Sequence, residues 1–322
     1  MHIDPELFTD SAVTDETRAF VEQIRDRLLT EPPLANATPD QVRAARRAGD
    51  SVFGPVIQYP RARTFRVPGP GGEIPLRVID ADDPAGVYVH IHGGGWVLGA
   101  ADLSDVGNLA MMHAAGVTVV SIDYRLAPEH PYPAGPDDCV AAAEWLIDNA
   151  SDEFGTDRLT IGGESAGANL AASVLLAVRD RTGFTDWRAA NLVYGSYFPP
   201  GTPSVKNWTI RGLVLDPASL VWFADHYFGS SATLADAMDP HLSPLYGDLS
   251  DMPPALFTVG TWDPLVDDSL FMACRWVAAE NKAELALYPG GIHAFDAFPI
   301  PIAAQARDRM HAFIKDHSSA PR

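Results

Sequence analysis

The chain has 322 residues, of which 47% are hydrophobic and 20% charged, a balance typical of a folded globular protein with a sizeable core. Its formal net charge of −19 disfavours nucleic acid, an anionic membrane surface or a strongly anionic substrate as partner. No apolar run is long enough to span a bilayer, and residues 1–6 lack a secretion-signal pattern, so a cytoplasmic location is expected. Cys139 and Cys274 fall in helical patterns and are expected to be buried free thiols.

The predicted elements begin with a polar, helix-like segment over residues 1 to about 50. Two extended segments follow, and the turn between them is rich in proline and glycine, which predicts an antiparallel pair. Strands and helices then alternate. The predicted strands are 64–67, 74–79, 87–91, 117–122, 159–161, 190–194, 255–259 and 283–288. The predicted helices after the strand pair are 137–149, 168–176, 267–280 and 302–315.

This alternation predicts a mostly parallel sheet with helices on both faces, and such sheets place ligand sites at the carboxyl ends of their strands. Residues 1–55 are expected to form an N-terminal helical cap segment, and residues 56–322 the catalytic domain. The irregular section at about 197–240 exceeds an ordinary connection, which indicates a cap insertion.

A GxSxG pentapeptide, Gly163-Glu164-Ser165-Ala166-Gly167, stands between a predicted strand and an alanine-rich helix. This is the strand-turn-helix context of a nucleophile elbow, in which the glycines allow a sharp turn that exposes the serine hydroxyl. The helix N-terminus adds N–H groups where negative charge would develop. Ser165 is therefore the predicted nucleophile, and Glu164 is expected to support the elbow and point away from it.

His92-Gly93-Gly94-Gly95-Trp96 directly follows the predicted strand 87–91. Consecutive glycines cost backbone entropy, so they indicate an unusual conformation or the close approach of another group. In an acyl-transfer enzyme, two glycine N–H groups of this loop and the N–H of Ala166 could converge on the tetrahedral oxyanion.

A serine nucleophile needs a base within hydrogen-bond reach and a carboxylate that orients the base. Among ten histidines His293 is the best placed, because it follows the last predicted strand. Asp263 is the favoured carboxylate, since it follows the penultimate strand and Pro264 would rigidify its loop. The chain order serine, aspartate, histidine is that of an α/β-hydrolase. Two rival carboxylates suit the first turn of the next helix better: Asp267 and Asp268.

With these motifs the chain resembles the bacterial hormone-sensitive-lipase family of carboxylesterases, from the first strand pair to the final helix. The resemblance rests on the glycine loop, the elbow, the segment 123–129 and the segments that hold Asp263 and His293. It implies the α/β-hydrolase fold, with a mostly parallel eight-stranded sheet flanked by helices and a helical cap. The sequence departs from the family at Val266, where many relatives carry arginine, and at Ala294, where glycine is usual.

The resemblance also implies that Gly94, Gly95 and Ala166 supply the oxyanion N–H groups, while His92 and Gly93 support the loop. The implied reaction is hydrolysis of small esters with short acyl chains through an acyl-enzyme, with no metal or organic cofactor. Two alternatives stay open: cleavage of an amide, carbamate or lactone by the same machinery, and a noncatalytic receptor, which the presence of His293 disfavours. The expected partners are the ester and, at most, a second copy of the chain in a homodimer.

Several side chains have a structural interpretation beside a functional one. His90 and His92 share one side of a strand, but without a third ligand a metal site is disfavoured. Arg125 and Glu129 are expected to pair with each other and fix the loop through residue 134, rather than to clamp a substrate. The substrate-pocket candidates, for which lid packing is the alternative, are Trp96, Trp222 and Phe223.

Overall fold

The computed structural model describes residues 2–228 and 237–319, which are built around one eight-stranded sheet in the order β1-β2-β4-β3-β5-β6-β7-β8. Strand β2 runs antiparallel to both its neighbours, and the other strand pairs are parallel, as the sequence predicts. The strands are β1 (Arg63–Gly69), β2 (Gly72–Ile79), β3 (Val87–Ile91), β4 (Thr118–Ile122), β5 (Leu159–Glu164), β6 (Ala190–Val193), β7 (Ala255–Trp262) and β8 (Ala283–Ile292).

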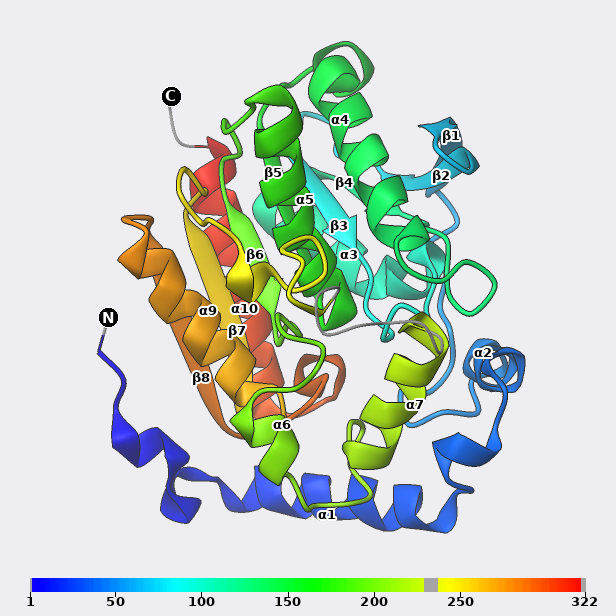
Figure 1. Cartoon of the computed structure of the whole chain (residues 1–322), viewed down its shortest axis with the longest axis vertical. Helices are drawn as coiled ribbons and strands as arrows, with labels where there is room; N and C mark the ends of the chain where they lie inside the picture. The colour runs from blue at the N-terminus through cyan, green and yellow to red at the C-terminus, as the bar shows by residue number, and fades with distance from the viewer. Residues whose placement is uncertain (1, 229–236, 320–322) are drawn as a thin grey trace.

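Helices cover both faces of the sheet (Figure 1). On one face, α4 (Ala134–Phe154), α5 (Ala166–Thr182) and α9 (Val266–Ala278) contribute to the larger hydrophobic cluster. On the other face, α3 (Asp105–Ala115) and α10 (Pro301–Ser319) contribute to the second cluster. Strands β3 and β4 are buried at every position, which explains why they read as apolar runs rather than as alternating patterns.

The remaining helices gather at the lower end of Figure 1. They are α1 (Asp15–Thr30), α2 (Pro39–Ala48), α6 (Pro203–Asn207) and α7 (Pro217–Phe228). Helix α2 has strong boundary signals, because Thr38 and Gln41 form a capping box and Gly49 ends the helix in the left-handed region. The described residues also form short 3₁₀ turns: η1 (Pro5–Phe8), η2 (Asp10–Ala12), η3 (Leu34–Asn36), η4 (Ala101–Ser104), η6 (Pro244–Tyr246) and η7 (Phe295–Ala297).

The expected cap insertion at about 197–240 contains α6 and α7, while its residues 229–236 lie outside the described part of the chain. The division into residues 1–55 and 56–322 stays a prediction. Within the described residues, no helix has the length and apolarity needed to cross a membrane.

The prediction of two buried thiols is half wrong. Cys139 on α4 is buried, but Cys274 on α9 is exposed. Helix α9 buries positions 268, 269, 272, 273 and 276, so position 274 faces solvent.

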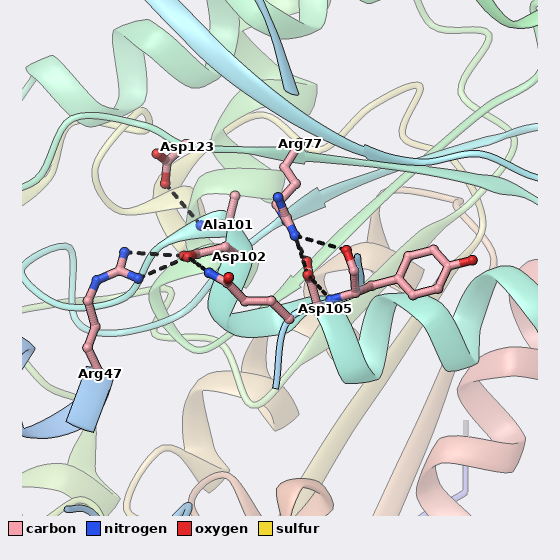
Figure 2. A network of polar contacts seen from close by, with 8 residues as sticks. Arg47, Arg77, Ala101, Asp102, Asp105 and Asp123 are labelled. Carbon is pink, nitrogen blue, oxygen red and sulfur yellow. Dashed lines mark hydrogen bonds and ion pairs between the residues drawn. The ribbon is translucent and has the colours of Figure 1, made fainter. Parts of the chain in front are cut away.

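A polar network attaches the N-terminal segment to the sheet and to α3 (Figure 2). Arg47 and Gln58 both donate to the carboxylate of Asp102 in η4. The buried carboxylate of Asp105 accepts from Arg77 of β2, with an Nε–Oδ1 distance of 2.6 Å, and from the backbone N–H of Tyr59 at 2.7 Å. The segment after α2 is therefore fixed to η4 and α3 by charge-assisted hydrogen bonds.

Replacing Arg77 with methionine should lower the free energy of unfolding by about 3 kcal/mol, because Asp105 would keep a buried charge without its ion partner. Urea unfolding of the variant and the parent chain at neutral pH measures this difference. Arg66→Met is the matched control, since Arg66 is exposed on the neighbouring strand and its loss should change stability by no more than about 0.5 kcal/mol. Equal losses in both variants would contradict the role given to the Arg77–Asp105 pair.

Candidate active site

Ser165 occupies a sharp turn between β5 and α5. Its backbone angles are φ 57° and ψ −118°, a conformation that L-residues rarely adopt and that surrounding contacts must hold. Its N–H donates to the carbonyl of Val193 at 2.9 Å. A Cβ at Gly163 or Gly167 would stand 2.2 or 1.9 Å from the carbonyl oxygen of Ile91, so the two glycines let the elbow pack against β3.

A chain of hydrogen bonds leads from Ser165 through His293 to Asp263. The Ser165 Oγ lies 2.9 Å from His293 Nε2, and His293 Nδ1 lies 2.8 Å from Asp263 Oδ2. Asp263 is fully buried, and its Oδ1 accepts from the N–H of Leu265 at 2.9 Å. When the carboxylate accepts a hydrogen bond from Nδ1–H of the imidazole, Nε2 is left as an acceptor for the serine hydroxyl.

The rival carboxylates lie elsewhere. Asp268 is buried and accepts from the backbone N–H groups of Tyr197 and Phe198 at 2.8 and 2.9 Å. Asp267 accepts from the N–H of Ser204 at 2.7 Å. Neither contacts His293, and both instead attach the segment 197–204 to the start of α9.

Three backbone N–H donors, two from the glycine loop and one from the first residue of α5, lie near Ser165. Among the described residues, the N–H groups of Gly94, Gly95 and Ala166 donate to no protein acceptor. All three residues line the same cavity as Ser165 and His293. A Cβ at Gly94 would approach the Leu98 carbonyl oxygen to 2.3 Å, so the loop conformation requires glycine there. The arrangement can bind an oxyanion formed next to Ser165 Oγ.

The cavity above Ser165 has a volume of about 2250 Å³, larger than most small-molecule sites. Its walls come from the N-terminal segment, the glycine loop, the segment 208–228 and the region after His293. Of the three predicted pocket aromatics, Trp96 and Phe223 line this cavity. Trp222 is not part of the lining, and its Nε1 donates to the carbonyl of Ala37 at 3.1 Å.

Both strand histidines have protein partners. His90 Nε2 lies 3.1 Å from the carboxylate of Glu164, and its Nδ1 lies 2.8 Å from Ser121 Oγ. His92 Nδ1 lies 2.9 Å from the Gly93 carbonyl oxygen, and burial lowers the pKa of His92, which favours the neutral ring. The described residues contain no group of three potential metal ligands.

The predicted ion pair between Arg125 and Glu129 is wrong. Arg125 pairs with Asp138 at 2.7 Å and also donates to the Ala134 carbonyl, as expected for a residue that fixes this loop. Glu129 pairs with Arg43 of α2 at 2.8 Å. The physical reason is that Asp138 is buried in the first turns of α4 and needs a cation, whereas Glu129 lies within reach of the N-terminal segment.

The two departures from the family pattern, Val266 and Ala294, lie just after the predicted acid and just after the predicted base. Val266 is the first residue of α9. Ala294 follows His293 and adopts φ 61°, a left-handed conformation that strains any residue with a Cβ. An alanine at this position therefore costs backbone energy that a glycine would not.

Sequence reasoning missed a contact to His293, the predicted base. The ring of Tyr194, at the end of β6, lies edge-on to the ring of His293 with 4.8 Å between centroids. Its hydroxyl donates to Asp296 Oδ1 at 2.6 Å. Burial raises the pKa of Asp296 to about 6, although the bond from Tyr194 opposes the shift. The position of Asp296 three residues after the predicted base is the one signal that could have found it.

The free energy of unfolding of the Asp296→Asn variant should increase relative to that of the parent chain as pH rises. The folded-state pKa of about 6 lies above the ordinary value of 3.8, so the folded protein loses stability from this group as pH rises through that interval. Because the Asp296 side chain is only partly buried, we expect the stability of Asp296→Asn relative to the parent chain to rise by only about 1 kcal/mol between about pH 5 and about pH 8. Urea unfolding at both pH values measures it. A difference between the chains that does not change with pH would contradict the assignment.

A nucleophile elbow and a glycine loop at the carboxyl edge of a mostly parallel eight-stranded sheet define an α/β-hydrolase. The family model described as alpha/beta hydrolase fold matches residues 88–297, and the chain belongs to this family, within the branch similar to hormone-sensitive lipase. The elbow, the glycine loop, Asp263 and His293 all lie within the matched residues.

The chain is similar to several characterised esterases. It is 38% identical to the carboxylic ester hydrolase LipN of Mycobacterium tuberculosis over 71% of this chain and 62% of LipN, which is less than two thirds of that relative. It is 35% identical to carboxylesterase NlhH of the same organism, with 92% and 96% covered. It is 32% identical to an ethyl acetate hydrolase of Pseudomonas putida, with 70% and 72% covered.

Among solved structures, a hyperthermophilic esterase from the archaeon Pyrobaculum calidifontis is similar, with a TM-score of 0.83 and 30% identity over 99% of this chain and all of that chain. The family and these relatives show that the chain is an enzyme, a carboxylic ester hydrolase.

Proposed function

We propose that the chain is a serine carboxylesterase with Ser165 as nucleophile, His293 as general base and acid, and Asp263 as the orienting carboxylate. The observation that carries this proposal is the continuous hydrogen-bond chain from Ser165 Oγ to Asp263. Ser165 Oγ attacks the ester carbonyl carbon while His293 Nε2 takes its proton, and Asp263 stabilises the imidazolium that forms.

The first tetrahedral intermediate places a negative oxygen opposite the N–H groups of Gly94, Gly95 and Ala166, which we propose as the oxyanion hole. His92 and Gly93 support this loop. When the intermediate collapses, the bond to the alcohol oxygen breaks and His293 protonates the leaving alcohol. Water, deprotonated by His293, then attacks the acyl-enzyme and releases the acid and the free serine.

Covalent labelling tests this proposal. Diethyl p-nitrophenyl phosphate should transfer one diethylphosphoryl group to Ser165 Oγ, because the new P–O bond replaces the bond to p-nitrophenolate. Intact-mass and peptide mass spectrometry should find one such group per chain, on Ser165, and none in the Ser165→Ala variant. Labelling at another serine, with Ser165 unmodified, would refute the assignment of the nucleophile.

We propose small, uncharged esters with short acyl chains as substrates. The net charge of −19 disfavours anionic esters, and a relative named ethyl acetate hydrolase acts on a short ester. The volume of the cavity leaves room for a larger alcohol part. A series of p-nitrophenyl esters measures acyl preference, and we expect kcat/KM to fall steeply beyond the short chains. Equal rates for butyrate and laurate would contradict this preference.

Amides, carbamates and lactones are the alternative substrates for the same groups. Comparing p-nitrophenyl butyrate, the corresponding anilide and a lactone decides among them, since faster anilide cleavage would contradict an ester preference. A noncatalytic receptor is disfavoured because His293 is present and bonded to Ser165. The homodimer and the cytoplasmic location stay proposals from sequence, which light scattering of the purified chain and fractionation of its native cells would test.

A further inference from the structure

The glycine loop adopts positive φ angles at three successive positions. Gly94, Gly95 and Trp96 have φ values of 119°, 59° and 61°, and for a tryptophan a positive φ is rare. Such a conformation persists only where surrounding contacts hold it. The groups that hold this loop therefore control where the N–H groups of Gly94 and Gly95 point.

Helix α7 contacts the loop at two of these positions. The Phe223 ring lies against the Cα of Gly95, where an added Cβ would stand 2.2 Å from Phe223 Cδ1. The next residue, Trp96, stacks on Tyr227 with 4.5 Å between ring centroids and 6° between planes. Both stacked rings are buried. Phe223 and Trp96 line the cavity, whereas Tyr227 does not; it reaches the cavity through Trp96 and through Phe228, whose ring centroid lies 5.0 Å from its own.

Helix α2 contacts the loop just after these three positions. Arg43 Nε donates to the carbonyl of Val97 at 2.9 Å, and Arg43 Nη2 donates to the carbonyl of Ala127 at 2.7 Å. The N–H of Ala127 in turn donates to the carbonyl of Trp96 at 3.0 Å. Two bonds to Glu129, at 2.8 and 2.9 Å, hold the guanidinium in this orientation.

We propose that Tyr227 and Arg43 are positioning residues for the oxyanion hole: Tyr227 acts through the Trp96 ring and Arg43 through the Val97 carbonyl. The cap elements α2 and α7 are then part of the catalytic machinery, beyond enclosing the substrate. This inference rests on the proposed function, because it assumes that Gly94 and Gly95 bind the oxyanion. A displacement of about 1 Å in such a donor is enough to lower a rate by about 100-fold.

The test compares Tyr227→Leu, which removes the stacked ring, with Tyr227→Phe, which keeps it. The hydroxyl of Tyr227 is buried and bonds nothing among the described residues, so the phenylalanine variant is a close control. With p-nitrophenyl acetate, Tyr227→Leu should lower kcat by about 10- to 100-fold with KM changed by less than about threefold. Tyr227→Phe should stay within about twofold of the parent chain in both constants.

A transition-state analogue separates positioning from a general loss of stability. When Ser165 Oγ adds to the carbonyl carbon of a trifluoromethyl ketone, the adduct places an oxyanion in the oxyanion hole. The inhibition constant of the ketone should therefore rise in Tyr227→Leu by the same factor by which kcat/KM falls. If Tyr227→Leu does not fold, Arg43→Met takes its place in the test. The control for Arg43→Met is Arg309→Met, which removes only an exposed ion pair with Glu284. Arg43→Met should show the same fall in kcat, and Arg309→Met should not.

Failure of this inference and failure of the proposed function give different results. If the parent chain loses no esterase activity on Ser165→Ala, the proposed function is wrong. If activity depends on Ser165 but a folded Tyr227→Leu or Arg43→Met keeps kcat and analogue binding within about twofold of the parent, the positioning role is overturned.

Discussion

Replacing Ser165 with alanine should lower kcat for p-nitrophenyl acetate by about 10⁵-fold, since removal of a serine nucleophile leaves only binding and oxyanion stabilisation. Alanine keeps the Cβ of serine, so the elbow backbone should remain as it is and the melting temperature should change little. Steady-state assays of both chains measure kcat, and circular dichroism measures folding and the melting temperature. A folded variant that retains one part in about a hundred of the activity would exclude Ser165 as the nucleophile.

Ser165→Gly adds a second outcome to the same experiment. The φ of 57° at this position strains a residue with a Cβ but not a glycine. The glycine variant should therefore be equally inactive yet unfold no more easily than Ser165→Ala, although glycine gains conformational entropy in the unfolded chain. Lower stability of the glycine variant by more than about 1 kcal/mol would show that the elbow stores little backbone strain.

The parts of the fold and site that could be predicted are those in which one residue type meets a backbone requirement. The glycines at 94, 163 and 167 stand where a Cβ would strike a carbonyl oxygen, and each is visible in the sequence. The buried strands are also visible, because a strand covered on both faces is predominantly apolar. Asp263 and His293, the proposed acid and base, directly follow the parallel strands β7 and β8, so their proximity to Ser165 could be predicted from the parallel sheet alone.

What could not be predicted depends on contacts between distant segments. The partner of Glu129 is Arg43, 86 residues earlier, and no local pattern joins them. The same holds for the stacking of Trp96 on Tyr227, which turns a predicted pocket residue into part of the loop's support. Helix α3 was missed for a local reason, since Gly107 and Asn108 in its first turns have low helix propensity and packing on the sheet overrides it.

Asp263 and Asp268 offer the sharpest comparison, because the sequence favours Asp263 as the orienting carboxylate and leaves Asp267 and Asp268 as its rivals. Replacing Asp263 with asparagine should lower kcat by about 10⁴-fold, since the amide would donate to Nδ1 and force the imidazole proton onto Nε2, where it blocks the transfer from Ser165. Asparagine has nearly the same shape as aspartate, so KM and folding should change much less than kcat.

Asp268→Asn is the matched control, since Asp268 is equally buried but accepts from Tyr197, Phe198 and Thr202 instead of His293. Its loss should lower the melting temperature, because the hydrogen bonds that attach the segment 197–204 to α9 weaken, while kcat stays within about threefold of the parent chain. Steady-state kinetics and thermal unfolding of both variants measure the contrast. Loss of turnover in Asp268→Asn but not in Asp263→Asn would contradict this assignment. The hydrogen bond between Asp263 and His293 would then have no part in the reaction, and Asp268 would be the orienting carboxylate in a different arrangement of α9.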